Sequence, residues 1–417
     1  MKLARVLALV LAALVSASAL AARDSVHVEF WTMSLKPKFT AYFKDLVAHY
    51  EAANPGVTLE WVDVPWDTLQ TKLTAAIVAR AAPALVQLNV PWAYDYALYG
   101  ALRPIDGLLG EDRARYTEGS IADATFRGRI YGFPHYNSVN VMAYNSALFK
   151  EAGITHVPVT FEEQLAAAKQ IRERTGQYGF SPALGKIAGI FLEEGLPLVA
   201  NGRAVFNSPR HVAFVTRLAD AYKAGGLLKD KLFSEDNYPA SIDAYKSGRM
   251  AMLVAPPSAL IRVRDDAPDV YGVTDVAPAP VGGSGIAAGG WLFLFAMPTG
   301  TDERVALEAA KFAKFLTNDE NQLAFAKLAG AFPTARRAAA DSHFQRIAVP
   351  SGAYEKAMAI GARGMDVVRT LYVGGVPGFE RLNKRLQDAV EAAVIGRRDP
   401  QAALDEAAAF WNSKLSP

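Results

Sequence analysis

Strand-like and helix-like segments alternate in the first part of the chain, and this alternation limits the possible folds more than any other feature. Apolar residues alternate in Val26–Trp31, and those of Lys38–Ala53 fall on one helical face. A second strand is predicted at Val57–Val64, a second helix from Asp67, and a third strand at Ala84–Leu88. Strands and helices that alternate in this way form β-α-β units, which predicts an α/β fold with a parallel sheet. Ligands of such sheets bind beyond the carboxyl ends of the strands.

The chain is too long for one hydrophobic core. It has 417 residues, of which 51% are hydrophobic, whereas single cores stop growing at roughly 250–300 residues. Two lobes are therefore predicted. The first is expected to contain residues 22–134 plus 286–338, and the second residues 135–285 plus 339–417.

The segment Phe126–Gly153 has the pattern of a passage from one lobe to the other. Arg127–Arg129 is predicted to form a tight turn, and Ile130–Pro134 a short extended run that Pro134 closes. A β-rich strand follows at Val139–Tyr144, and a helix starts at Asn145. We expect the chain to return to the first lobe through the extended segments at residues 270–280 and 289–297.

The first residues have the pattern of a secretory signal. Lys2 and Arg5 precede the apolar run Val6–Val15, and small residues follow as far as Ala21. This run is much shorter than the roughly 20 residues that span a bilayer. Residues 1–21 are therefore predicted to be a cleaved signal peptide, and the protein to be secreted to the periplasm or cell envelope without stable membrane insertion.

Composition excludes several kinds of site. The chain has no Cys, which excludes disulfides, thiolate metal sites and a lipid-anchor cysteine. The formal charge of +2 becomes +2 − 2 = 0 once Lys2 and Arg5 leave with the signal. Because the remaining charges are mixed along the chain, no basic face for nucleic acid is expected.

Patterns of catalysis and metal binding are missing from the sequence. It contains no His-Glu-x-x-His helix, no Gly-x-Ser-x-Gly elbow and no phosphate loop. The six His residues are scattered singly, so neither a metal nor another cofactor is predicted. The acidic pair Glu193–Glu194 is expected to be solvated, since glycoside hydrolysis needs two carboxylates that face one bond.

Tryptophans are the strongest candidates for ligand contact. Trp31, Trp66 and Trp92 are each predicted just after a strand, and Trp291 follows the return loop. An indole ring can lie against the C–H face of a sugar, where burial of roughly 60 Å² contributes about 1.5 kcal/mol. The two other tryptophans, Trp61 and Trp411, are predicted to fill cores.

Polar partners for a sugar are expected near these rings. Asn89 is the best candidate, because a planar amide can bridge two vicinal hydroxyls. Asp67 has two open interpretations, a ligand contact or the N-cap of its helix. The remaining polar candidates lie at the first strand end, in the passage and in the last quarter of the chain: Thr32, Ser34, Tyr136, Asn137, Asn140 and Arg336.

Several short segments, taken in order, resemble bacterial extracellular solute-binding proteins of carbohydrate importers, of the maltose and trehalose type. They are Phe30–Thr32, Asn54–Val57, Ala82–Val86, Tyr131–Pro134, Phe149–Ile154, Tyr245–Met252, Gly290–Trp291 and Phe332–Thr334. The family often has Pro-Asp-Val where this chain has Pro83–Leu85, which puts only the local loop geometry in question.

The resemblance implies a two-lobed periplasmic binding protein fold. Each lobe would be a mostly parallel sheet flanked by helices, with the chain crossing between lobes, and Gly290 would join Trp291 at the ligand. It further implies a monomeric receptor without a cofactor, which captures a mono- or oligosaccharide by hinge closure and delivers it to the permease subunits of an ABC importer.

Two alternatives stay open. The same fold could bind a glycerophosphodiester, a polyamine or an organic anion; a phosphate ligand would need Arg, Lys or helix N-termini in place of aromatic platforms and amides. A secreted glycan-active enzyme could also use tryptophan platforms, but it would need two facing acids.

Overall fold

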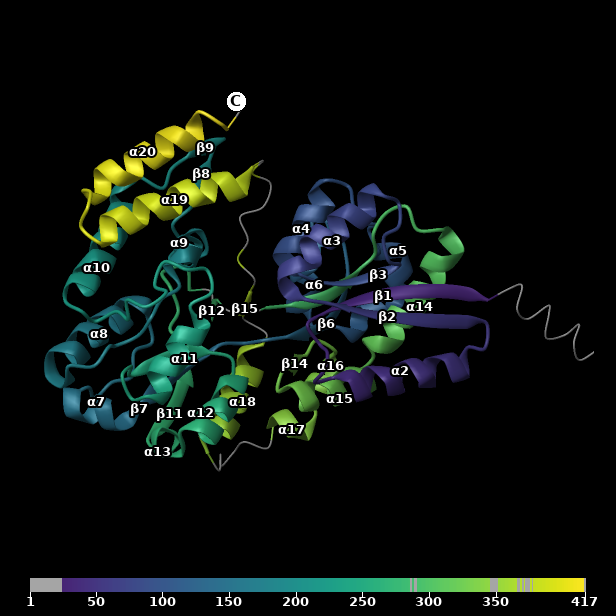
Figure 1. Ribbon diagram of the computed structural model, residues 1–417, viewed down its shortest axis with the longest axis horizontal. Helices are drawn as coiled ribbons and strands as arrows, with labels where there is room; N and C mark the ends of the chain where they lie inside the picture. Colours follow the sequence, from purple (N-terminus) through teal and green to yellow (C-terminus); the bar gives the residue numbers. More distant parts are fainter. Residues whose placement is uncertain are drawn as a thin grey trace, which may run out of the picture. The chain divides into compact units, whose positions relative to one another are not determined.

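The computed structural model describes residues 25–285, 287–288, 291–345, 352–365, 368–369, 371, 376 and 378–415. The predicted signal peptide and Gly290 lie outside the described residues. Contacts divide the chain into two compact units (Figure 1). Unit 1 contains Met1–Tyr136, Leu292–Phe325 and Pro333–Ala338, and unit 2 contains Asn137–Trp291, Ala326–Phe332 and Ala339–Pro417. The predicted lobe boundaries stay a prediction.

Unit 1 begins with the predicted alternation of strands and helices. Its elements, three of which continue into unit 2 at their last residues, are β1 (Val26–Met33), α2 (Thr40–Ala53), β2 (Val57–Val64), α3 (Trp66–Val78), β3 (Leu85–Asn89), α4 (Val90–Leu98), α5 (Asp106–Leu109), η1 (Gly110–Arg115), α6 (Glu118–Asp123), β4 (Thr125–Phe126), β5 (Arg129–Ile130), β6 (Phe133–Asn137), β13 (Phe293–Ala296), α14 (Glu303–Leu316), α15 (Asp319–Ala329) and α16 (Arg336–Ala339). The short strand β14 (Phe332–Pro333) lies across a division between the units.

A six-stranded sheet in the order β14-β6-β13-β3-β1-β2 forms the centre of unit 1. β1 pairs in parallel with both β2 and β3, as predicted. β13 runs antiparallel to both β3 and β6. β6 therefore points the same way as β1, β2 and β3, and β13 is the reversed strand between β3 and β6. The sheet of unit 1 is mostly parallel, as predicted, with β13 as an exception.

Neighbouring residues of β1 show how helices cover the two faces of this sheet. Phe30 contacts Phe43 of α2 and Phe312 of α14, with ring centroids 6.4 and 4.9 Å apart. Trp31 points to the opposite face, where Lys72 of α3 lies over its ring. Figure 1 accordingly draws α2 and α3 on opposite sides of the strands. Trp61 stacks on Phe43 at 4.7 Å, which confirms its predicted structural role.

The passage out of unit 1 differs from its prediction at Pro134. The turn at Arg127–Gly128 is confirmed, since β4 and β5 pair around it. Pro134, however, does not end the extended run, because β6 continues through it to Asn137. The pairing of β6 with β13 shifts register between Phe293 and Leu294, and such an irregularity tolerates a residue without an N–H.

Unit 2 is mostly helical. Its elements are β7 (Val141–Asn145), α7 (Ser146–Ala152), α8 (Phe161–Thr175), η2 (Leu184–Lys186), α9 (Ile187–Glu193), β8 (Val199–Ala200), β9 (Arg203–Ala204), α10 (Pro209–Lys223), α11 (Tyr238–Lys246), β10 (Met252–Ala255), α12 (Ser258–Asp266), α13 (Pro268–Gly272), β11 (Thr274–Pro278), β12 (Ala287–Ala288), α17 (Ser342–Gln345), α18 (Ala353–Gly364), β15 (Val368–Arg369), α19 (Phe379–Val394) and α20 (Pro400–Asn412).

The three-stranded sheet of unit 2 is antiparallel. Its order is β10-β7-β11, and β7 runs antiparallel to both neighbours. The prediction of a mostly parallel sheet in each lobe was wrong for this unit. β10 and β11 point the same way and are linked by α12 and α13, as in a β-α-β unit. The chain nevertheless places β7 between them with the opposite direction.

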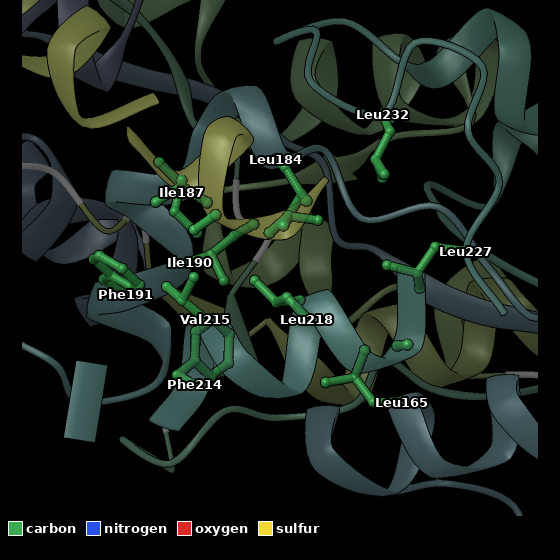
Figure 2. Close-up of a cluster of buried hydrophobic side chains, with 14 of the residues drawn as sticks. Leu165, Leu184, Ile187, Ile190, Phe191, Phe214, Val215, Leu218, Leu227 and Leu232 are labelled. Atoms are coloured by element: carbon green, nitrogen blue, oxygen red, sulfur yellow. The ribbon is translucent and has the colours of Figure 1, made fainter. Parts of the chain in front are cut away.

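Helices pack around a large apolar core in unit 2. Figure 2 shows side chains from α8, η2, α9 and α10 turned toward one another, with Leu165, Phe191 and Leu218 among them. Trp411 of α20 belongs to the same cluster; it is fully buried and donates from Nε1 to the Leu382 oxygen at 2.7 Å. Its predicted core role is confirmed.

Candidate functional site

Four aromatic side chains form a continuous row in unit 1. Trp66 lies 4.9 Å from Trp92 and 6.0 Å from Phe293, measured between ring centroids. Tyr136 stacks on Phe293 at 4.7 Å with an interplanar angle of 24°. Trp66 is 40% exposed, whereas the other three rings are half-buried. We call these four residues the aromatic row; three of them were predicted ligand contacts.

The aromatic row lies where the strands end. Trp66 begins α3 directly after β2, and Trp92 lies in the first turn of α4 after β3. Phe293 pairs with Asn89, the last residue of β3, and with Tyr136 in β6. Residues that follow parallel strands gather at one edge of a sheet, as the sequence predicted for tryptophans at strand ends.

Trp31 has a different environment from the other tryptophans. It lies inside β1 and not after it, so the predicted position was wrong. The ring is 4% exposed, Lys72 Nζ lies 4.5 Å from its centroid, and Nε1 donates to Glu29 at 2.6 Å. In this arrangement the ring has no open face for a ligand.

A carboxylate organises the loop that follows β1. Asp63 accepts from the Thr32 hydroxyl at 2.6 Å and from the backbone N–H groups of Leu35 and Lys36, both at 2.9 Å. Ser34, in the same loop, has φ 54° and accepts from the Trp66 N–H at 2.9 Å. Thr32 is fully buried. The predicted contacts Thr32 and Ser34 therefore support the position of Trp66.

Asn89 and Asp67 occupy the first turns of two helices. Asn89 is the N-cap of α4 and accepts from the Trp92 N–H at 2.9 Å through Oδ1. No partner for its Nδ2 lies among the described residues. Asp67 is exposed, and the N-cap of α3 is Pro65, so the N-cap interpretation of Asp67 was wrong.

A second group of candidates lies in unit 2 around Trp291. This residue is 36% exposed, and its N–H donates to the Ser138 oxygen at 3.0 Å. The flanking amides differ: Asn137 is buried and accepts from Ser138 N at 2.8 Å, whereas Asn140 is half-buried. Lys186 Nζ lies 4.8 Å from the Trp291 ring centroid. The structure thus pairs a cation with the Trp291 ring, and Asn137 binds the same residue, Ser138, that accepts from the Trp291 N–H.

Lys186 is an exposed residue directly before α9, and its ammonium lies near the carboxylates of Asp236, Glu235 and Glu193. Burial lowers the pKa of the Lys186 ammonium, against the opposing effect of Asp236, Glu235 and Glu193. Burial also raises the pKa of the Glu193 carboxyl from 4.5 to about 7; Glu194 adds to this shift and Lys186 opposes it. Glu193 and Glu194 are both half-buried, so this acidic pair is less solvated than expected.

Stability should depend on pH through Glu193. The folded state holds its proton up to about pH 7 while the unfolded state releases it near 4.5, so the contribution of this group to stability falls as pH rises between these values. We expect Glu193→Gln to raise the free energy of unfolding by about 1–3 kcal/mol at pH 8 and to change it little at pH 4.5. Urea unfolding at both pH values tests this, with exposed Glu151→Gln as control. An equal effect at both pH values would contradict the assignment.

Arg336 lies apart from the aromatic row. It lines a hollow of about 850 Å³ together with residues of η1 and α6, and no residue of the aromatic row is among those that line it. Its Nη2 lies 3.5 Å from Glu118 Oε1 in an exposed ion pair. The structure does not bring Arg336 together with the other candidates of unit 1.

Two residues of the candidate site, Phe293 and Lys186, were missed in the sequence. Phe293 follows Trp291 by two residues in an extended segment, where residues two apart face the same side, so this spacing was a usable signal. Lys186 had no distinctive pattern.

No cluster of three or more His, Cys, Asp or Glu side chains that could hold a metal occurs among the described residues. In the same part of the chain, no helix combines the length and apolar character that a membrane span requires.

An aromatic surface at the strand ends of an α/β sheet, with amides beside it, has the chemistry of a small-solute binding protein.

The chain belongs to the family of bacterial extracellular solute-binding proteins, since that family's model matches residues 45–350. A periplasmic-binding protein from Synechococcus sp. MITs9220, which has been assigned to oligosaccharides, is similar in structure with a TM-score of 0.82 and 29% identity, over 93% of this chain and 98% of that one. The sugar-binding protein MalE of Xanthomonas citri gives a TM-score of 0.75 at 20% identity, over 93% and 97% of the two chains. The predicted family and two-lobed α/β fold class are thereby confirmed.

A relative with another cargo is also similar in sequence. The sn-glycerol-3-phosphate-binding periplasmic protein UgpB of Pectobacterium atrosepticum is 24% identical, over 97% of this chain and 94% of its own.

Proposed function

We propose that this solute-binding protein is the receptor of a carbohydrate importer and that it binds a mono- or oligosaccharide. The aromatic row carries the proposal, because an exposed indole beside further rings suits the apolar face of a pyranose. Trp66, Trp92 and Tyr136 are proposed contacts in unit 1, with Asn89 Nδ2 as a hydrogen-bond donor. Asn140 and Trp291 are the proposed contacts in unit 2.

The remaining predicted contacts have other proposed roles. Thr32 and Ser34 position Trp66, whereas Asn137 orders its own loop. Asp67 and Arg336 are exposed and would meet a ligand only at its periphery. The receptor acts as a secreted monomer, performs no covalent chemistry and delivers its sugar to the permease subunits of an ABC importer.

Relatives support a sugar as cargo. The MalE protein of Xanthomonas citri is a sugar-binding protein, and a structural neighbour from Thermotoga maritima was determined with maltose bound. One observation favours an anionic cargo instead: Lys186 lies against Trp291, and the UgpB relative binds sn-glycerol 3-phosphate.

A thermal-shift panel tests the ligand class. A ligand that binds the folded protein raises its melting temperature by mass action. At a ligand concentration a hundredfold above Kd, the free energy of unfolding increases by about 2.7 kcal/mol. The panel contains maltose, trehalose, cellobiose, diacetylchitobiose and sn-glycerol 3-phosphate. We expect a shift with at least one sugar and none with the phosphate. If only sn-glycerol 3-phosphate shifts the melting temperature, the ligand is a phosphate compound and the proposed sugar is wrong. If cleaved sugar is recovered from the complex, the protein is an enzyme.

A further inference from the structure

A buried glutamine sits where the chain passes repeatedly between the two units. Gln322 of α15 is 1% exposed, and every polar group of its side chain is bonded within unit 1. Nε2 donates to the Pro134 oxygen at 3.0 Å and to the Thr317 oxygen at 2.9 Å. Oε1 accepts from the Thr334 N–H at 2.6 Å and from the Ala335 N–H at 3.0 Å. The Thr334 hydroxyl also lies 3.1 Å from Oε1.

These partners lie beside three crossing points of the chain. The chain leaves unit 1 after Tyr136, two residues beyond Pro134, and re-enters it at Pro333, next to Thr334. It also leaves after Phe325, three residues beyond Gln322 itself. A single side chain thus fastens three crossing segments to unit 1.

The fastened strands also carry part of the aromatic row. β14, β6 and β13 are neighbours in the sheet, and Tyr136 of β6 stacks on Phe293 of β13. Tyr136 is therefore only two residues from a bond that Gln322 makes. Bonds at this position limit how far the crossing segments can move relative to the ligand-contacting rings.

We propose that Gln322 is a positioning residue that anchors the hinge to unit 1 and so sets the equilibrium between open and closed forms, without touching ligand. The inference rests on the proposed function, because closure around a solute is what gives the hinge its effect on affinity. Loosened crossing segments must be ordered again when ligand binds, and this ordering opposes binding.

The first readout needs no ligand. Because the chain has no Cys, Val78→Cys in unit 1 and Val159→Cys in unit 2, both exposed, can carry spin labels. Pulsed electron paramagnetic resonance then gives the distribution of distances between the labels. Gln322→Met is expected to broaden this distribution. Gln164→Met is the matched control, since Gln164 is also buried but lies within unit 2, where its Nε2 makes a weak contact with Met142 Sδ at 3.7 Å.

Two milder variants keep the test decisive if Gln322→Met folds poorly. Thr334→Val removes the hydroxyl, which donates to Gln322 Oε1 at 3.1 Å and to the His135 oxygen at 3.4 Å, and should broaden the distribution slightly. Gln322→Glu can still accept from Thr334 and Ala335, but it donates only when protonated. Its distribution should therefore narrow from pH 8 to pH 5, a change that wild-type protein should not show.

The second readout is affinity for the panel sugar with the largest thermal shift. Gln322→Met should weaken it about tenfold, and Gln164→Met less than twofold. Distributions that match between Gln322→Met and wild type would overturn the inference and leave the proposed function intact. If no panel sugar binds wild-type protein, the proposed function fails, while the label distances still decide the role of Gln322.

Discussion

Replacement of Trp66 by Ala is expected to weaken sugar binding by about ten- to a hundredfold while the fold survives. Trp66 is 40% exposed, so its removal leaves no large internal cavity. A sugar ring that covers roughly 60 Å² of the indole gains about 1.5 kcal/mol, which corresponds to roughly a tenfold change in Kd. Trp92 lies 4.9 Å away and would lose a neighbour that fixes its ring, which adds to the loss.

Isothermal titration with the panel sugar that gives the largest thermal shift measures this effect. Tyr99→Ala is the matched control, because Tyr99 is an exposed aromatic residue at the end of α4 and does not belong to the aromatic row. If Trp66→Ala binds the sugar with a Kd within twofold of the wild-type value, the aromatic row is not part of the ligand site. The anionic alternative would then rest on Lys186 and Trp291.

Local patterns were enough to predict most elements of unit 1. The strand predicted at Val57–Val64 is β2 to the residue, and the helix predicted at Lys38–Ala53 is α2 less two residues. The spacing of apolar residues predicts such elements because it depends only on whether the segment itself is a helix or a strand. The reversed direction of β13 could not be predicted in this way, since it depends on where the chain re-enters unit 1.

Strand ends predicted the aromatic part of the candidate site better than the polar part. Trp66 and Trp92 form one surface because both lie in the first turns of helices that follow β2 and β3, the two strands that flank β1 in the sheet. Asn89 is the last residue of its strand, but a short polar side chain there can cap the next helix, and Pro91 in the first turn was a signal for that cap. Gln322 gave no local signal, because its partner Pro134 is far away in sequence.

A small polar residue at a strand end can thus find hydrogen-bond partners nearby, whereas a large ring there cannot be fully buried by its own loop. Thr32 and Ser34 find partners within their own loop and its neighbours, so the fold uses their hydroxyls. The aromatic rings are too large to be covered by their own loops, so part of their surface stays exposed to solvent. The loop after β1 contacts Trp66 through Ser34 and so limits the motion of this ring, and Asp63 holds that loop in place.

Asp63→Ala is expected to lower the free energy of unfolding by about 3 kcal/mol and to weaken sugar binding about tenfold. The change removes the acceptor for the Thr32 hydroxyl and for the N–H groups of Leu35 and Lys36. Each such bond to a charged acceptor contributes about 1.5–3 kcal/mol, part of which water restores at this half-buried position. Ser34 holds φ 54° only while its loop is fixed, and its hydroxyl accepts from Trp66.

Urea unfolding measures the stability, and hydrogen exchange at the amides of Leu35, Lys36 and Trp66 measures the positioning. Glu60→Ala is the control on the same strand, since its exposed ion pair with His27 should contribute less than about 1 kcal/mol. Asp63→Asn should lower the free energy of unfolding by less than Asp63→Ala and by more than Glu60→Ala. Its amide oxygen can accept the bonds that one carboxylate oxygen accepted, but its NH₂ group then faces the Lys36 N–H, which is also a donor. If Asp63→Ala loses stability while the Trp66 amide stays protected and sugar affinity is unchanged, Asp63 supports the sheet alone and Trp66 is positioned by α3.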